Sequence, residues 1–287
     1  MILSLLISDN LIVRKRKGRI EKIFLFLMKR REKMKKILFV VAAIYFALNA
    51  KNILPAVIEQ AQAEKEYSTI TVVAEKEEEQ SVARLDEELN VSGSVVATKE
   101  IEIPEEAMSA DLKALYEVNK DLVGVLYIPD IELMLPVAQG DDNDYYLHHT
   151  FEGTKSMSGC LMLDKDASLD DPNKIIYGHN MRSGKMFGSL DKLLTAEGEK
   201  KMYLYTFDGC YVYTIFSCFV TEVGSEAYAS VNKANAELYY NTMLGLNASG
   251  MTAPSYEGQN MLTLSTCHGK SGTSGRLIVN AICDGIY

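Results

Sequence analysis

The sequence has few of the residues from which metal sites are built. It contains five cysteines and four histidines, with no Cys-x-x-Cys pair and no histidine spacing typical of metal ligands. These absences leave no case for zinc, and we expect no metal or other cofactor. Five is also an odd number, so disulfide pairing outside the cell leaves at least one thiol free. Cys210, Cys218 and Cys283 lie in apolar runs and are interpreted as core residues, and His148 and His149 are expected in a surface loop.

Positive charge is also in short supply. The chain has 30 Lys and Arg against 39 Asp and Glu, a formal net charge of −9 at pH 7, which argues against nucleic acid as the main partner. The charges are unevenly distributed. Residues 14–36 hold twelve basic and two acidic residues, whereas residues 59–111 hold fifteen acidic and four basic residues. The acidic block is interpreted as a solvated spacer, because its composition is typical of segments that bury little apolar surface.

The sequence lacks an uninterrupted apolar run of bilayer length. The run at 37–48 has twelve residues, whereas a spanning helix needs about 20. The longer stretch 37–58 reaches that length if the side chain of Lys51 extends to the outer interface. With the basic block before it, this stretch predicts a single-pass signal anchor with the N-terminus in the cytoplasm and the remainder outside the cell. A cleaved signal peptide is the alternative, with Ala-Gln-Ala at 61–63 as its processing site.

These features divide the chain into four parts. Residues 1–36 form a basic cytoplasmic N-terminus, 37–58 the membrane anchor, 59–105 an acidic extracellular spacer, and 106–287 the folded catalytic domain. Met34 is a second plausible start, which leaves open whether the first 33 residues are translated, and we assign them no function.

Residues 106–287 consist largely of short apolar runs separated by turn signals. Eight of these runs are predicted strands, at 122–128, 133–138, 159–163, 174–177, 202–207, 211–223, 261–266 and 276–282. Eight short strands favour a mainly β fold, a closed eight-stranded barrel rather than a parallel sheet. A short amphipathic helix at 108–119 precedes them. A second helix, at 231–244, is inserted before the strand that ends in Cys267.

One pair of strands carries a nucleophile. In Met-Leu-Thr-Leu-Ser-Thr-Cys at 261–267, Thr263, Ser265 and Cys267 share one face of the strand. The glycines and serines of 268–275 mark a connection to the strand that begins at Arg276. This hairpin sets a thiol at the end of one strand beside a guanidinium at the start of the next.

His179 is the candidate base for this thiol. It follows a short buried strand and Gly178, where the chain opens into a loop. A cysteine reacts as its thiolate, and an ordinary thiol pKa of about 8.5 leaves only a small fraction ionised at neutral pH. A neighbouring imidazole and guanidinium raise that fraction or take the proton directly. A lone Cys or His is usually a core residue, but three such residues at strand ends favour an active site.

The motifs that carry these residues resemble those of sortases, specifically class B. They are Tyr-Gly-His-Asn-Met at 177–181, Thr-Leu-Ser-Thr-Cys at 263–267, and Arg276. Further blocks at 123–129, 136–140, 142–147 and 186–190 also resemble class B sequence, so the resemblance spans about residues 107 to 287. Class B enzymes often carry an acidic residue just after the cysteine, where this chain has His268 and Gly269. No acid is therefore assigned as a third catalytic residue.

The resemblance implies a membrane-anchored cysteine transpeptidase that cleaves a C-terminal sorting signal of secreted proteins after Thr. In that reading Cys267 forms a thioester, and His179 protonates the leaving amine and then deprotonates the incoming one. Arg276 holds the substrate backbone and stabilises the oxyanion. The acceptor is an amine of a peptidoglycan precursor or a pilin.

Three further residues are candidate substrate contacts: Ser265, Tyr177 and Asn143. Core packing explains Tyr177 equally well, and a turn explains Asn143. Two other functions remain open. The first is a secreted cysteine endopeptidase that uses the same three residues with water as acceptor, and the second is a non-catalytic wall-associated module on a degenerate barrel.

Overall fold

The computed structural model describes residues 58, 61, 65, 103–269 and 272–287. The predicted cytoplasmic segment 1–36, the anchor 37–58 except for Ile58, and nearly all of the spacer 59–105 lie outside the described residues. Within the described part of the chain, no helix has the length and apolar character needed to cross a bilayer.

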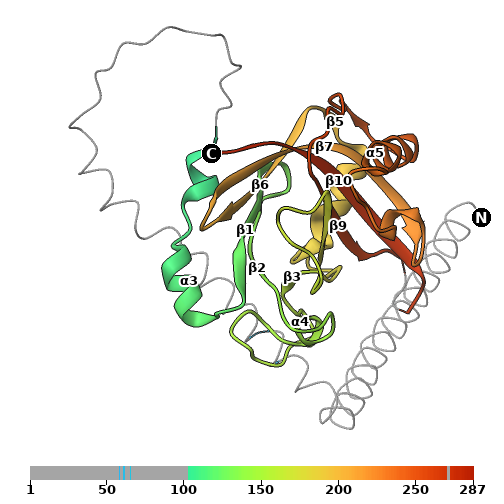
Figure 1. Ribbon diagram of the computed structural model, residues 1–287. Coiled ribbons are helices and arrows are strands. Elements are labelled where there is room, and N and C mark those ends of the chain that lie inside the picture. Colours follow the sequence, from blue (N-terminus) through green and yellow to red (C-terminus); the bar gives the residue numbers. More distant parts are fainter. Residues whose placement is uncertain (1–57, 59–60, 62–64, 66–102, 270–271) are drawn as a thin grey trace, which may run out of the picture. The chain divides into compact units, whose positions relative to one another are not determined.

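Eight strands close into a barrel, as the sequence predicts (Figure 1). Around the barrel the strand order is β1-β2-β3-β4-β9-β10-β7-β6, and β6 pairs with β1 to close it. Two neighbouring pairs, β2 with β3 and β4 with β9, are parallel, and the others are antiparallel. The strands are β1 (Leu122–Ile128), β2 (Leu133–Ala138), β3 (Leu161–Leu163), β4 (Asn173–Tyr177), β6 (Lys200–Thr206), β7 (Gly209–Glu222), β9 (Met261–Cys267) and β10 (Gly275–Ile286).

Shorter elements connect and flank these strands. β5 (Glu197–Gly198) and β8 (Gly250–Met251) form a small parallel pair of their own. The α-helices are α3 (Leu112–Val118), α4 (Tyr145–His148) and α5 (Ala236–Gly245). The 3-10 helices are η2 (Glu105–Met108), η3 (Pro129–Ile131), η4 (Phe187–Thr195) and η5 (Glu226–Tyr228). His148 therefore ends a short helix rather than lying in a loop, although its side chain is exposed as predicted.

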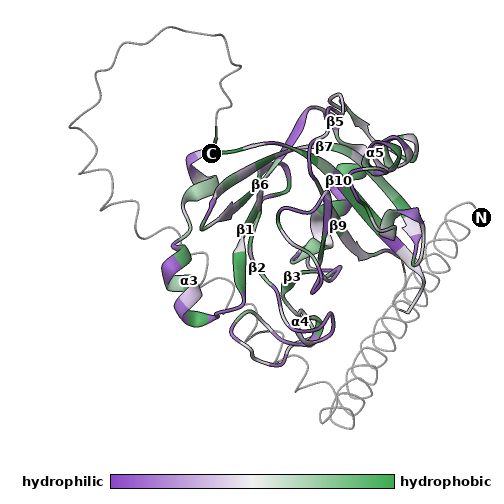
Figure 2. Cartoon of the chain, in the orientation of Figure 1, coloured by the Kyte–Doolittle hydropathy of each residue, from purple (hydrophilic) through white to green (hydrophobic). Residues whose placement is uncertain are grey.

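Alternation along the strands separates the barrel interior from its outer face. Leu262 and Leu264 of β9 belong to the main core inside the barrel, whereas Met261 packs in a second cluster together with residues of α5. Figure 2 shows hydrophobic residues along the barrel strands and hydrophilic ones in the loops around α4. The long strand β7 contains a β-bulge, with an extra residue at Phe216 opposite the Asn280–Ala281 step of β10.

The N-terminal helix is shorter than predicted. Its N-cap is Asp111, whose carboxylate accepts hydrogen bonds from the backbone N–H groups of Lys113 and Ala114, so α3 begins at Leu112 rather than at 108. Of the larger apolar side chains on this helix, Leu112 and Leu115 are buried, whereas Tyr116 and Val118 are exposed.

The inserted helix also begins later than predicted, at Ala236 rather than at 231. Asn232 and Asn235 form a turn just before it, because the Asn235 side chain accepts from Asn232 N and the Asn232 side chain accepts from Ala234 N. Such local bonds compete with the helical ones. From Ala236 onward, α5 packs its tyrosines on the outer face of the barrel, where the ring centroids of Phe216 and Tyr240 lie 4.5 Å apart.

Candidate active site

The three predicted catalytic residues come from three adjacent strands at one end of the barrel. Cys267, the last residue of β9, pairs directly with Arg276 at the start of β10. On the other side of β9, the parallel ladder with β4 ends with Tyr177 opposite Ser265. Continuing this register by two residues sets His179 opposite Cys267, on the same face as Tyr177. The end of the β4–β9 ladder and the pairing of β9 with β10 therefore bring His179, Cys267 and Arg276 to one end of the barrel, as a row of three residues that line one cavity.

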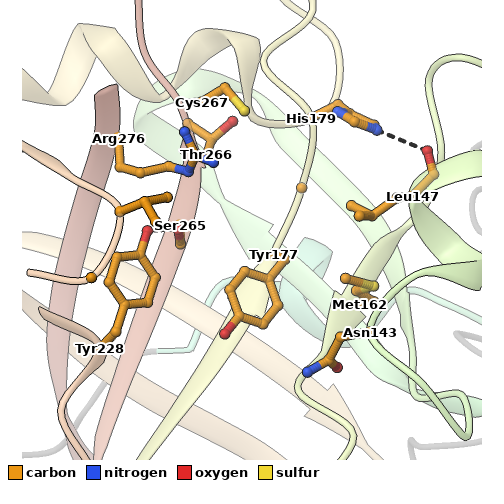
Figure 3. Close-up of a pocket in the computed structure, with 13 residues that line it drawn as sticks. Asn143, Leu147, Met162, Tyr177, His179, Tyr228, Ser265, Thr266, Cys267 and Arg276 are labelled. Carbon is orange, nitrogen blue, oxygen red and sulfur yellow. Dashed lines mark hydrogen bonds between the residues drawn. The ribbon is translucent and has the colours of Figure 1, made fainter. Parts of the chain in front are cut away.

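This row lies along a cavity of about 410 Å³ on the outer face of the barrel (Figure 3). All six residues predicted to act in catalysis or substrate binding line the cavity: Asn143, Tyr177, His179, Ser265, Cys267 and Arg276. Leu147 and Met162 add apolar surface. Arg276 is the one lining residue with a permanent charge, which suits a site for a polar but largely uncharged peptide backbone.

The imidazole of His179 is held by the loop that contains α4. Its Nε2 lies 2.8 Å from the carbonyl oxygen of Leu147, as the dashed line in Figure 3 shows. A carbonyl oxygen only accepts, so Nε2 carries the proton of the neutral ring and Nδ1 is the nitrogen that accepts one. The backbone of His179 is fixed as well, since its carbonyl accepts from Phe187 N at 3.0 Å. The base candidate is thus held at both its ring and its main chain.

Two glycines allow the close packing around His179. A Cβ at Gly178 would lie 2.5 Å from Leu161 Cδ2 and 2.7 Å from a ring carbon of Phe187. Gly178 is therefore required for close packing, whereas its φ lies outside the left-handed region and places no demand for glycine on the exit from β4. Gly159 has a φ of +59°, and a Cβ there would lie 3.1 Å from the His179 ring. Any side chain at 159 would be strained and would push on the imidazole.

Cys267 differs from the other four cysteines in exposure. It is the exposed thiol of the set, whereas Cys160, Cys210 and Cys218 are buried and Cys283 is half-buried, and none of the five forms a disulfide. Burial raises the pKa of Cys210 to about 11 and that of Cys218 to about 12. These thiols remain protonated at neutral pH, in agreement with their interpretation as core residues.

Arg276 keeps most of its hydrogen-bonding capacity for a ligand. Its Nη1 donates to the carbonyls of Gly275 (2.8 Å) and Thr273 (3.3 Å) in its own hairpin. No carboxylate in the described part of the chain forms an ion pair with it. The backbone N–H of His268, which follows the nucleophile, donates to the Gly275 carbonyl at 2.9 Å. Because that N–H is engaged, Arg276 is the evident donor for an oxyanion at Cys267.

Ser265 has a partner that the sequence did not reveal. Its hydroxyl lies 2.7 Å from the hydroxyl of Tyr228, the last residue of η5. Both residues line the cavity, and burial raises the pKa of Tyr228, so the phenol stays neutral at physiological pH. Thr266 is a second unpredicted member of the cavity wall, with a buried hydroxyl that has no hydrogen-bond partner among the described residues. No motif or periodic pattern in the sequence indicates that Tyr228 or Thr266 lines the site.

Tyr177 and Asn143 share one acidic partner, Asp164. The Asp164 carboxylate accepts from the Asn143 amide and from the Tyr177 hydroxyl, each at 3.0 Å. The Asn143 carbonyl also accepts from the backbone N of Lys165 at 2.8 Å. Asn143 therefore connects two loops at the cavity wall, and Tyr177 is both a packed and a cavity-lining residue. The sequence gives no indication that Asp164 supports the site.

Comparisons of this chain with family models and with curated proteins point to the same family. The sortase domain family model matches residues 126–283. The chain is 45% identical over 86 residues to sortase B of Listeria monocytogenes, a match covering 29% of this chain and 35% of the relative. It is 30% identical over 122 residues to sortase B of Staphylococcus aureus, covering 41% and 50%. These matches span half or less of the length of either curated relative.

Solved structures agree. Sortase B of Clostridium perfringens superposes with a TM-score of 0.54 at 29% identity, over 60% of this chain and 99% of that one. Sortase B of Bacillus anthracis gives a TM-score of 0.51 at 27% identity, over 60% and 82%. The class B resemblance of the motifs is confirmed by these relatives. With a family model matched over more than half of its length, this chain belongs to the sortase family.

Proposed function

We propose that this protein is a cysteine transpeptidase that cleaves a C-terminal sorting signal after Thr and transfers the acyl group to an amine. The observation that carries the proposal is the row formed by three strand ends along one cavity. In this row the exposed thiol of Cys267 has Arg276 directly opposite, and His179 follows the paired end of β4 by two residues. The activity of the class B relatives is consistent with it.

Acylation begins when the Cys267 thiolate attacks the Thr carbonyl of the signal. The C–S bond forms, the carbonyl electrons move to oxygen, and the N–H groups of Arg276 stabilise the resulting oxyanion. Collapse of this intermediate breaks the peptide bond, and protonated His179 gives its proton to the leaving amine. The product is a thioester on Cys267 and a free C-terminal fragment.

Transfer reverses these steps with a second amine. The acceptor enters the place of the released fragment, and His179, now neutral, takes its proton through Nδ1 while Nε2 remains bonded to the Leu147 carbonyl. Attack on the thioester forms the new amide and returns the thiolate of Cys267. An amine of a peptidoglycan precursor or a pilin has this chemistry.

Product analysis tests the proposal. The full chain is incubated with a library of five-residue sorting peptides that contain Thr, with and without a glycine-based amine, and the products are identified by mass spectrometry. We expect an amide of the Thr-terminated fragment with the added amine, and accumulation of a Cys267 adduct when the amine is left out. Free Thr carboxylate as the sole product, at a rate that the amine does not change, would support an endopeptidase instead.

We further propose that the protein is held in the cell membrane by residues 37–58, with its catalytic domain outside. The basic block before this apolar stretch and the acidic block after it support this orientation, and sorting substrates reach their cleavage site only after export. Protease added to wall-stripped cells should digest the chain after about residue 59, and the protein should stay with the membrane fraction. Release into the medium would indicate a cleaved signal peptide, and protection of the domain would contradict the orientation.

A further inference from the structure

The side chain of Asn180, the residue after the base candidate, reaches the strand of the nucleophile. Its Nδ2 donates to the main-chain carbonyl of Cys267 at 2.7 Å, which joins two residues 87 positions apart in the sequence. Asn180 is exposed and does not line the cavity. Its amide therefore holds the main chain of the nucleophile without forming part of the cavity wall.

This bond occupies a regular place in the β4–β9 ladder. In a parallel pair, the backbone carbonyls of one strand accept hydrogen bonds from every second backbone N–H of its neighbour. The last such bond runs from Gly178 N to the Ser265 carbonyl, at 3.2 Å. The next would run from the N–H of residue 180 to the carbonyl of Cys267. After His179 the chain turns away instead, and Asn180 forms an antiparallel bridge with Met186.

We propose that Asn180 is a positioning residue, whose side-chain amide supplies the ladder bond that the backbone gives up and so fixes Cys267 relative to His179. On its other side Cys267 is held by β10, through its pairing with Arg276 and through the bond from His268 N to the Gly275 carbonyl. The Asn180 amide is the bond that links Cys267 directly to the segment carrying the base. The catalytic part of this inference rests on the proposed function.

The expected consequence falls on the chemical step. Displacing a reacting atom by about 1 Å costs up to about a hundredfold in rate. The position of Cys267 relative to the base is what Asn180 controls, whereas the cavity wall does not include it. Loss of the amide should therefore lower kcat and leave KM nearly unchanged. It should also slow alkylation of Cys267 at neutral pH, because a thiol displaced from its base is less ionised.

Two variants of Asn180 and two of a matched asparagine test this. Asn180→Ala removes the donor. Asn180→Asp keeps the shape, replaces the donor by an acceptor, and adds a negative charge beside the thiol. Asn260 is the control, since its exposed amide donates to the Asp170 carbonyl across 90 positions, at 3.2 Å, beyond the opposite end of β9. The readouts are kcat and KM on a sorting peptide, and the rate of Cys267 alkylation against pH.

We expect kcat of Asn180→Ala to fall about tenfold or more, with KM within about twofold of the wild type. Asn180→Asp should fall further, and its alkylation profile should shift to higher pH because the carboxylate opposes ionisation of the thiol. Asn260→Ala and Asn260→Asp should keep both readouts within about twofold of the wild type.

The proposal is overturned if kcat of Asn180→Ala stays within twofold of the wild type, if the loss falls on KM, or if the Asn260 variants lose as much. Failure of the proposed function is a separate result, because a wild-type chain that cleaves no sorting peptide still reports through alkylation. In that case an unchanged alkylation profile in both Asn180 variants would overturn the positioning role, and slower alkylation in both would support it.

Discussion

Two cysteines of this chain lie near a basic side chain, at opposite ends of the barrel. Cys267 ends β9 opposite Arg276, with its side chain exposed. Cys283 lies on β10 beyond the other end of β9, half-buried, and interacts electrostatically with Lys174 of β4. Both pairs thus combine a sulfur nucleophile with a cation. The first pair shares its cavity with His179.

Burial makes the difference between the two pairs. Desolvation raises the pKa of Cys283 above its ordinary value of 9.0, although the charge of Lys174 acts in the opposite direction. The same burial lowers the pKa of Lys174 from 10.5 to about 8. Burial therefore disfavours the charged form of each group. At the other end the thiol faces solvent and the guanidinium stays charged, so exposure decides which pair is reactive.

Removing each thiol in turn gives the largest expected effect. Cys267→Ala should abolish cleavage of a sorting peptide, because no second nucleophile lies in the row. Cys283→Ala should leave cleavage within about twofold of the wild type, since that thiol is remote from the cavity. Steady-state cleavage rates of the two purified variants make the comparison. Residual turnover in Cys267→Ala, or a comparable loss in Cys283→Ala, would contradict it.

Removing the partners of Cys267, His179 and Arg276, should have the second-largest effect on cleavage. His179→Ala and Arg276→Ala should each lower kcat/KM by at least about 10²- to 10³-fold, the typical cost of losing a base or an oxyanion donor. His148→Ala and Lys200→Ala are the controls, because both side chains lie outside the cavity wall. Near-normal turnover in either catalytic variant would mean that its role is misassigned.

At the opposite end, Lys174 should make stability depend on pH. Its folded pKa is depressed, so between about pH 8 and 10.5 the unfolded chain binds more protons than the folded one. The contribution of Lys174 to the free energy of unfolding therefore rises with pH across this window. The shift corresponds to about 3 kcal/mol of penalty, present in full below pH 8.

Lys174→Met removes that penalty together with the bond from Lys174 to the Leu169 carbonyl, whose loss costs about 1 kcal/mol. The variant should be more stable than the wild type at pH 7, and its advantage should shrink from pH 8 to 10.5. Denaturant unfolding of both proteins at a series of pH values under reducing conditions measures this. A stability difference that does not vary with pH would show that the amine is not desolvated.

Chelation should have the smallest effect. Since the nucleophile is a side-chain thiol, EDTA should leave the cleavage rate unchanged while iodoacetamide stops it. The described residues contain no group of three or more metal-ligating side chains. In the acidic loop at 141–144, Asp142 already accepts from the backbone N–H groups of Asp144 and Tyr145. Loss of activity in EDTA, restored by calcium, would point to a site in this loop.

The strands and their faces could be predicted from the sequence because alternation reports burial directly. β1 and β2 coincide with their predicted bounds, and Ser265 and Cys267 share the predicted face of β9. The pairing of Cys267 with Arg276 followed from the same pattern, because the two strands form a hairpin. The parallel pairing of β4 with β9, which brings His179 to the same cavity, was not predicted. Helix boundaries were less accurate, because side chains such as Asp111 and Asn235 decide them locally.

The wall and the supports of the site could not be predicted. Tyr228 reaches Ser265 from a 3-10 turn 37 positions away, and no periodic pattern announces such a contact. The bond from Asn180 to the Cys267 carbonyl depends on where the chain leaves the ladder, which is a property of the folded backbone. Likewise, Asp164 accepts hydrogen bonds from Asn143 and from Tyr177 at the end of β4, and only the closed barrel brings these segments together.

Site-resolved alkylation of the native protein tests the central claim most directly, that one thiol of five is built for reaction. The protein is treated briefly with iodoacetamide at neutral pH, digested, and the label at each cysteine is quantified by mass spectrometry. Cys267 should be labelled fast, and His179→Ala should slow it, whereas Cys160, Cys210, Cys218 and Cys283 should stay unlabelled until the protein is unfolded. Labelling of Cys283 as fast as Cys267, or no effect of His179→Ala, would contradict the account.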